Sequence, residues 1–363
     1  MKLIFLKLSI FDIIHTMPKY TVRRRKKTKV LKKSGFKKAI SVLGILSFSL
    51  AILFGVFTFN KLNQQFASAQ SSSSFDIQGE SFYSVAYMIV DDFDEEPVTL
   101  SKLYFLIIDK ESLRLINYEI PVLAQIDVPG KYSIEPFSNI LALGSLNDTD
   151  VLLGGANLVN LSILKLFGFP VDRFVLVDHS YEQYLDNLVN GETAFSMLDI
   201  DLSKFKSSLK TNLTLKEFAD LYKFANSLPY DRIVKKTLTE SYFENTSLID
   251  DELLDVTFSG NISKENLSIA VLNGTTESGV ANFGARVVRN MGGRVVAVGN
   301  AYNDHVKSLI IANDPSSNTV RLLAHALNIE DVLSIEDASD YIESEISRAD
   351  MTIIVGLDLA LSL

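Results

Sequence analysis

The sequence contains no cysteine and no tryptophan, and only four of its 363 residues are histidine. Without cysteine the chain can form no disulfide framework, no thiolate metal site and no cysteine nucleophile. Its stability must therefore come from ordinary hydrophobic cores. Glycine and proline are modest in number and 47% of the residues are hydrophobic, a composition that indicates a folded chain and not a disordered stalk.

One stretch lacks charge altogether, the 21 residues from 39 to 59. At 1.5 Å per residue, a helix of this length is about 32 Å long, enough to cross the roughly 30 Å hydrocarbon layer of a bilayer. Eleven Lys or Arg lie between Met17 and Ala39, whereas only Lys61 follows closely on the other side. The positive-inside rule therefore predicts a basic cytoplasmic arm at 1–38, a transmembrane helix at 39–59 and an extracytoplasmic remainder.

The true start and the fate of this anchor stay open at the sequence level. Residues 1–16 are too short and too charged for a second span, so Met17 is an alternative start to Met1. Ala67-Ser68-Ala69 resembles a signal-peptidase site, but a 21-residue apolar segment is long for the core of a signal peptide. We therefore expect an uncleaved anchor.

Positive charge is scarce beyond the predicted span. Thirteen of the 35 basic residues and one of the 44 acidic residues precede it, which leaves 22 basic and 43 acidic residues and a net charge of about −21. Nucleic acids and anionic lipids would be repelled by such a charge, so no nucleic-acid partner is expected.

Periodicity beyond the span predicts two mixed α/β domains. A Ser-rich linker is expected at 60–79, a first domain at 80–240, a polar linker at 241–264 and a second domain at 265–363. In the first domain we expect a strand at 82–90, a hairpin of 103–108 with 113–120, a helix after Gly154-Gly155, a strand at 173–177 and a helix at 181–188. A further helix at 211–228 should begin with Thr214 as N-cap and Glu217 as its capping-box partner.

The second domain is expected to be a small α/β sandwich. Apolar runs predict strands at 267–272, 295–298, 309–312 and 351–355, and apolar residues at helical spacing predict helices at 279–291, 320–327 and 338–346.

Three motifs in this second domain resemble the C-terminal domain of the LytR-CpsA-Psr family of bacterial envelope proteins. They are Val271-Leu272-Asn273-Gly274 followed by Gly279-Val280-Ala281, the strand from Val296 to Ala301, and the closing Ile353-Ile354-Val355-Gly356-Leu357-Asp358. All three occur in order with suitable spacing. The resemblance implies a location in the cell envelope more than a chemistry.

Residues 80–240 resemble a divergent copy of the same family's catalytic domain. Ile120-Pro121 and Pro129-Gly130 hold the positions of the family's Ile-Pro-Arg-Asp and following Pro-Gly, and Gly154-Gly155 and Val171-Asp172 follow in the family's order. The resemblance implies transfer of a glycopolymer from polyprenyl pyrophosphate to peptidoglycan, with arginines that hold the pyrophosphate and carboxylates that hold Mg²⁺. Phosphoryl-type transfer depends on such positioning and charge neutralisation.

The residues that would carry this chemistry depart from the family pattern at three places. Thr99-Leu100-Ser101-Lys102 replaces the family's Arg-Ser/Thr-Asp-Thr, Val122-Leu123 replaces the Arg-Asp after Ile-Pro, and the segment 192–203 contains no arginine. Loss of phosphate-clamping arginines costs orders of magnitude in rate. The sequence therefore favours a non-catalytic relative that needs no cofactor.

Six residues are candidates for ligand binding. Lys102, Arg114 and Arg173 are the nearest cations to the expected pocket, although an exposed arginine at a strand end is the simpler interpretation of Arg173. Asp178 could orient a ligand, but beside His179 alone it is far short of a metal set. Asn273 and Gly274 could present backbone N–H groups to an anion or a sugar, with a tight strand-to-helix turn as the alternative.

Two further groups are expected to be structural. The acidic run from Asp91 to Glu96 lacks EF-hand spacing, so a solvated loop is favoured over a cation site. His305 and His325 are expected to be surface or packed residues.

These observations together predict a single-pass cell-membrane protein with an extracytoplasmic α/β ectodomain that binds a cell-wall glycopolymer or an envelope protein and transfers nothing. Two alternatives stay open. The first is an active Mg²⁺-dependent phosphotransferase that has rebuilt its pocket from Lys102, Arg114 and Arg173. The second is an envelope-related transcriptional attenuator, which the basic arm beside the membrane and the absence of a DNA-binding helix pair disfavour.

Overall fold

The computed structural model describes residues 52–58, 75–94, 96–130, 132–146, 151–182, 208–257 and 260–363. Residues 1–58 and 59–363 form two separate units, and all of the sheets lie in the second. Within the described ranges no helix is long and apolar enough to cross a bilayer. Of the predicted span at 39–59 only residues 52–58 are described, as a helix; the basic arm and most of the Ser-rich linker lie outside the described residues.

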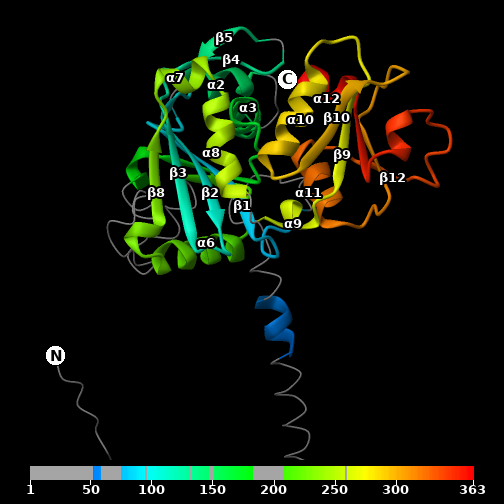
Figure 1. Cartoon of the computed structure of the whole chain (residues 1–363). Helices are drawn as coiled ribbons and strands as arrows, with labels where there is room; N and C mark the ends of the chain where they lie inside the picture. Colours follow the sequence, from blue (N-terminus) through cyan, green and yellow to red (C-terminus); the bar gives the residue numbers. More distant parts are fainter. Residues whose placement is uncertain are drawn as a thin grey trace, which may run out of the picture. The chain divides into compact units, whose positions relative to one another are not determined.

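The first half of the larger unit is built on a six-stranded sheet in the order β7-β6-β1-β2-β3-β8 (Figure 1). Its central strand β1 pairs antiparallel with β2 and parallel with β6, β2 and β3 form the predicted hairpin, and β8 lies parallel to β3. The strands are β1 Phe82–Val90, β2 Leu100–Asp109, β3 Arg114–Ile120, β6 Arg173–Asp178, β7 Leu209–Thr211 and β8 Ile233–Thr237. The predicted strands of this region are confirmed; β7 and β8 were not predicted.

Helices cover both faces of this sheet. On one face, the core includes buried residues of α2, α3 and α8, and its aromatic centre is Phe105, whose ring lies 4.6 Å from that of Phe167. On the other face, α6 packs against β1 and β2. These helices are α2 Phe137–Ser145, α3 Val151–Phe167, α6 Leu215–Ser227 and α8 Ser247–Thr257. The capping box predicted for α6 is present, with Thr214 and Glu217 bonded to each other's backbone.

Helices α2 and α3 cross at glycines. A Cβ added at Gly155 would lie 2.4 Å from the carbonyl oxygen of Leu141, and one added at Gly144 would lie 2.6 Å from that of Gly154. The predicted helix therefore begins before Gly154-Gly155 and not after it, because the pair is needed inside α3 for close packing on α2.

Gly155→Ala should lower the free energy of unfolding by about 1–3 kcal/mol, since an overpacked backbone contact must push two helices apart. Urea unfolding checks this, with Gly79→Ala as the matched control because a Cβ at Gly79 meets no atom within 4 Å. Equal stability of the two variants would contradict the close crossing.

The second half of the unit contains a five-stranded sheet in the order β10-β9-β13-β11-β12. All neighbours are parallel except β11 and β13. The main core lies between this sheet and the helices α10 and α11 (Figure 1). The elements are β9 Ser268–Asn273, α10 Val280–Asn290, β10 Arg294–Asn300, β11 Leu309–Ala312, α11 Asn318–Ala326, β12 Asp331–Ser334, β13 Met351–Val355 and α12 Leu357–Ser362.

Two predictions about secondary structure are wrong. Residues 241–264, predicted as a polar linker, mostly fold into helices, and Ile249, Leu253 and Val256 of α8 are buried in the first core. Residues 338–346, predicted as a helix, form turns that lead into the 3-10 helix Ser344–Ser347 and cover the second face of the five-stranded sheet. The predicted helix at 181–188 lies mostly outside the described residues.

Helix α10 caps the C-terminal end of α3 and so joins the two sheets. The Arg286 guanidinium donates to the carbonyl oxygens of Lys165 and Leu166, and the Asn290 amide donates to that of Phe167. Both side chains also bond the Asp250 carboxylate of α8. Three elements from distant parts of the sequence therefore meet at one helix end whose carbonyls would otherwise lack partners.

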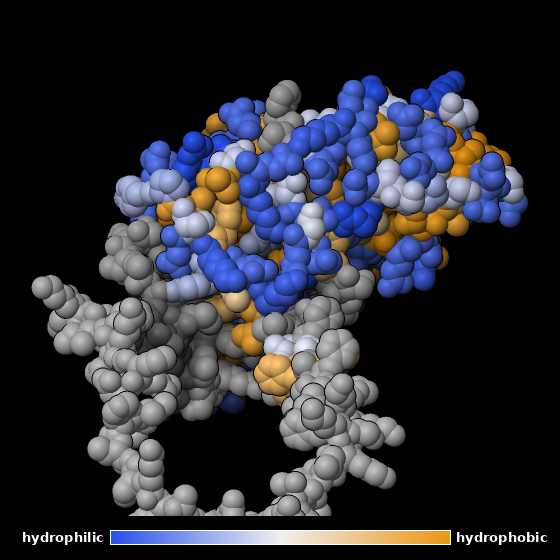
Figure 2. Space-filling model, turned by 90° about the horizontal axis from the view of Figure 1, so that it is seen from below, coloured by the Kyte–Doolittle hydropathy of each residue, from blue (hydrophilic) through white to orange (hydrophobic). Residues whose placement is uncertain are grey.

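Seen from below, the described surface is mostly hydrophilic, with smaller apolar areas between the polar ones (Figure 2). Many of the large apolar side chains of the described residues are instead buried in the cores beside the two sheets.

Candidate functional site

The end of the six-stranded sheet where the family motifs fall is formed by β2, β6 and the turn after β3. Lys102 pairs with Ile89, Asp178 pairs with Val90 and Ile120 pairs with Leu103, so all three regions meet at one end. We call this end, with Lys102, Asp178, His179 and Glu182, the strand-end mouth. It contains two of the six predicted ligand residues, Lys102 and Asp178.

The one lysine of this mouth is neutralised. The nearly buried carboxylate of Glu182 forms an ion pair with the Lys102 ammonium group, and its second oxygen lies 2.5 Å from Nδ1 of His179. Asp91, Asp92 and Asp94 add exposed carboxylates in the loop that joins β1 to β2 at the same end. The described residues of the mouth therefore carry more negative than positive charge.

The described residues of the mouth do not fit the Mg²⁺ ion that the family resemblance implies. Asp178 accepts a hydrogen bond from the Ser180 N–H, 2.7 Å away. The Glu182 carboxylate already contacts Lys102 and His179. Val122 packs on the core. Leu123 stands where the family has an aspartate, so this position supplies no carboxylate, and 81% of its surface is exposed. The described residues contain no group of three or more His, Asp or Glu side chains that could hold a metal ion.

The other four predicted residues lie elsewhere. Arg114 begins β3 and lies 3.5 Å from the carboxylate of Asp109, at the opposite end of the sheet from Lys102. Asn273 ends β9 in the other sheet and Gly274 follows it. The Asn273 side chain accepts from the Thr275 N–H, and the Gly274 N–H donates to the carbonyl oxygen of Val355. The turn interpretation of Asn273-Gly274 is the one that these contacts support.

The prediction that Arg173 is an exposed arginine at a strand end is wrong, because its side chain is buried. Its side chain is 4% exposed and forms a two-point ion pair with Glu217, which is 5% exposed, with Arg173 Nη2 to Glu217 Oε1 at 2.8 Å. The same guanidinium donates to the carbonyl oxygens of Asp172 and Phe75. Its donors are thus engaged inside the protein, which also removes it as an anion contact.

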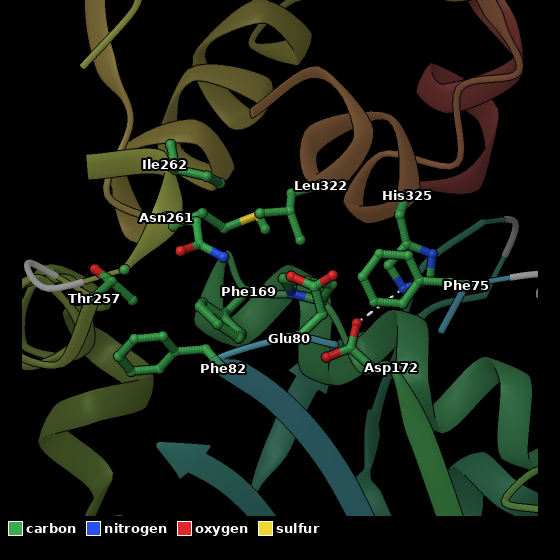
Figure 3. A pocket seen from close by; sticks show the side chains of 13 residues that line it. Phe75, Glu80, Phe82, Phe169, Asp172, Thr257, Asn261, Ile262, Leu322 and His325 are labelled. Atoms are coloured by element: carbon green, nitrogen blue, oxygen red, sulfur yellow. Dashed lines mark hydrogen bonds and ion pairs between the residues drawn. The ribbon is translucent and has the colours of Figure 1, made fainter. Parts of the chain in front are cut away.

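A second feature, which the sequence does not predict, is a strap formed by residues 75–80. The Phe75 ring stacks on His325 of α11 at 3.8 Å (Figure 3). The Arg321 guanidinium lies 5.3 Å from the same ring. Glu80 forms an ion pair with Arg321 at 2.5 Å. Lys110 donates to the carbonyls of Ile77 and Gln78, and burial lowers the pKa of its amino group.

Asp172 links this strap to the core of the first half. Its Oδ1 lies 2.8 Å from Nε2 of His325 (Figure 3), and its Oδ2 accepts from the backbone N–H of Ser84 at 2.7 Å. The Ser84 hydroxyl itself donates to the Pro170 carbonyl, so it is not poised as a nucleophile. This Ser, Asp and His set is a structural network, and His325 is the packed residue that the sequence suggested.

Among the described residues three hollows border the strap, and two of these lie between the two halves of the unit. The smaller, about 50 Å³, is lined mainly by apolar side chains such as Phe82, Phe169 and Leu322 and is drawn in Figure 3. The larger is an open groove of about 1170 Å³ between α3 on one side and α11, α12 and the turn before β12 on the other. No short sequence motif marks either hollow, because their walls come from segments more than 150 residues apart.

A family model described as LytR cell envelope-related transcriptional attenuator matches residues 266–359. The expected C-terminal domain of the LytR type is therefore confirmed. No curated protein sequence matches the chain.

Several solved structures from the LytR-CpsA-Psr family resemble the chain. TagT of B. subtilis is 16% identical, and the match covers 53% of this chain and 98% of that one at a TM-score of 0.34. TagV of B. subtilis is 13% identical, with 44% and 85% covered and a TM-score of 0.33. The family protein YwtF (TagT) with bound octaprenyl pyrophosphate lipid is 15% identical, with 53% and 98% covered and a TM-score of 0.34. TM-scores below 0.5 do not by themselves establish a common fold.

Proposed function

We propose that the chain is a membrane-anchored, extracytoplasmic cell-envelope protein that binds a cell-wall glycopolymer or an envelope protein and transfers nothing. The observation that carries this proposal is the strand-end mouth. There Glu182 neutralises Lys102, Leu123 is exposed where the family has an aspartate, and three aspartates stand nearby. A pyrophosphate would meet net negative charge where transfer requires cations.

The cellular location rests on the sequence and on the C-terminal domain. The match of residues 266–359 to an envelope-related family supports a place in the envelope. The uncharged run at 39–59 behind a basic arm supports a single span with a cytoplasmic N-terminus. An excess of acidic residues beyond that run argues against nucleic acid as a partner.

The purified full-length chain should release no phosphate from a short-chain polyprenyl pyrophosphate, with or without Mg²⁺. It should co-sediment with peptidoglycan sacculi or capture an envelope protein by crosslinking. Phosphate release that depends on Mg²⁺ would overturn the non-catalytic part of the proposal. Failure of both sedimentation and crosslinking would overturn the binding part.

The enzyme alternative needs Lys102, Arg114 and Arg173 to act together. Arg114 lies at the other end of the sheet from Lys102, and Arg173 is buried against Glu217. Their separation disfavours a pocket rebuilt from these three cations. Replacement of Lys102 by alanine should accordingly leave any background phosphate release unchanged, and a Mg²⁺-dependent activity lost in this variant would restore the alternative.

A further inference from the structure

We infer that the groove between α3 and helices α11 and α12 binds an uncharged or amine-bearing saccharide chain and rejects phosphate-bearing polymers. This inference rests on the proposed function, because it gives the proposed binding protein a site and a ligand chemistry. The site is separate from the strand-end mouth. It is lined by both halves of the unit, so neither half alone contains it.

The groove offers side-chain amides on several walls. Asn157 and Asn160 stand one turn apart on α3, while Asn212 follows β7 and Asn328 precedes β12. The Asn157 side chain is exposed and Asn160 is half-buried, and both residues line the groove, where a ligand can meet their amides. Amides both donate and accept, which suits the hydroxyl and acetamido groups of sugars.

Apolar side chains alternate with these amides. Leu153 and Leu161 lie on the same face of α3 as Asn157, and Phe174 and Ile329 contribute from β6 and the turn before β12. Sugar rings present apolar C–H faces beside their polar edges, so a mixed wall matches them better than a wholly apolar one. At about 1170 Å³ the groove exceeds the usual 300–1,000 Å³ of small-molecule sites, enough for several linked rings.

The charge of the groove selects against phosphate. Its one arginine, Arg321, is held by Glu80, while Asp76 and Glu330 are exposed carboxylates without an ion pair of their own among the described residues. Although burial acts to raise it, the hydrogen bonds that Ser308 donates hold the pKa of Asp358 below its ordinary value, so this carboxylate is also ionised near neutral pH. Repulsion between these carboxylates and a polyanion disfavours binding, whereas an ammonium group is attracted.

Isothermal titration calorimetry of the full-length chain tests the inference with three probes of matched length. These are a hexamer of N-acetylglucosamine, its deacetylated and positively charged counterpart, and a hexamer of glycerol phosphate. The first two should bind and the third should not. Asn157→Leu and Asn160→Leu should each weaken the first two at least tenfold, about 1.4 kcal/mol. Asn226→Leu, which changes an exposed asparagine of α6 outside the groove, should bind as the unchanged chain does.

A charge variant provides a second test that does not depend on correct folding of the two asparagine variants. Glu330 is exposed, so Glu330→Lys should fold normally, weaken the deacetylated hexamer several-fold and leave the acetylated hexamer unchanged. Unchanged affinity of all three groove variants for both hexamers would overturn the inference, as would binding of glycerol phosphate as tight as that of the saccharides.

Failure of the saccharide inference can be distinguished from failure of the proposed binding function. If neither hexamer binds but the chain still co-sediments with sacculi or captures an envelope protein, the saccharide groove is wrong and the proposed binding function stands. If sedimentation and crosslinking fail as well, both fall together.

Discussion

Arg173→Ala is expected to lower the free energy of unfolding by about 3–5 kcal/mol, the typical loss when one partner of a buried ion pair is removed. The variant would leave the Glu217 carboxylate inside the protein without its guanidinium, 2.8 Å away in the unchanged chain. It would also leave the carbonyl oxygens of Asp172 and Phe75 without their donor. Urea unfolding followed by circular dichroism measures the loss.

Two comparisons decide whether the buried charge is the cause. Arg348→Ala removes an exposed arginine 3.9 Å from Glu345 and should cost no more than about 0.5 kcal/mol. The double variant Arg173→Met with Glu217→Gln should recover much of the loss, because an amide needs less compensation than a carboxylate. If Arg173→Ala were no more harmful than Arg348→Ala, the guanidinium would be free for a ligand, and the enzyme alternative would regain one of its cations.

The elements that the sequence predicts well carry their signal locally. The strand from Phe82 to Val90 and the hairpin after it are apolar runs of strand length, and Thr214 with Glu217 marks a helix start within four residues. The prediction failed at α8, where Ile249, Leu253 and Val256 face the core at helical spacing. Four acidic residues on the other faces made the segment look polar, and the stripe gains its meaning only once the sheet that it covers is known.

The candidate site was harder to predict, because its residues meet only in the folded chain. Arg173 at a strand start predicts exposure unless its partner Glu217, 44 residues later, is known. Asp172 and His325 are 153 residues apart, and Phe75 lies in the segment expected to be linker. What the sequence could supply was the departure from the family motifs at Lys102 and Leu123. It could not supply the Glu182 side chain that neutralises the remaining lysine.

Because the groove is lined by both halves, binding in it should depend on how the two halves are joined. Leu164 of α3 belongs to the core of the C-terminal sheet, so the C-terminal turns of α3 are fixed to that half. The middle turns, which carry Asn157 and Asn160, line the groove together with residues of α11 and of the turn after it. We therefore expect the contacts at the end of α3 to influence the shape of the groove.

Arg286→Ala should test that junction, with an expected loss of about 2–3 kcal/mol in the free energy of unfolding. The guanidinium joins Asp250 to the last carbonyls of α3, and its removal leaves a partly buried carboxylate and two carbonyl oxygens with fewer partners. Gly168 next to it has φ +58°, and a Cβ there would lie 2.8 Å from the Asn290 amide, so this end of α3 requires a glycine.

The control for Arg286→Ala is Lys264→Ala, which removes another ion pair between the halves, to Glu111. That pair is exposed, so its loss should cost less than about 1 kcal/mol. A cycle with Asp250→Ala should give a coupling of about 1–3 kcal/mol, because the two side chains are in contact. Hydrogen exchange should speed up in the last turn of α3 in the Arg286→Ala chain and stay unchanged in the Lys264→Ala chain. Equal exchange in the two variants would show that the end of α3 does not depend on its contacts with Arg286, and that the groove does not depend on the capped helix end.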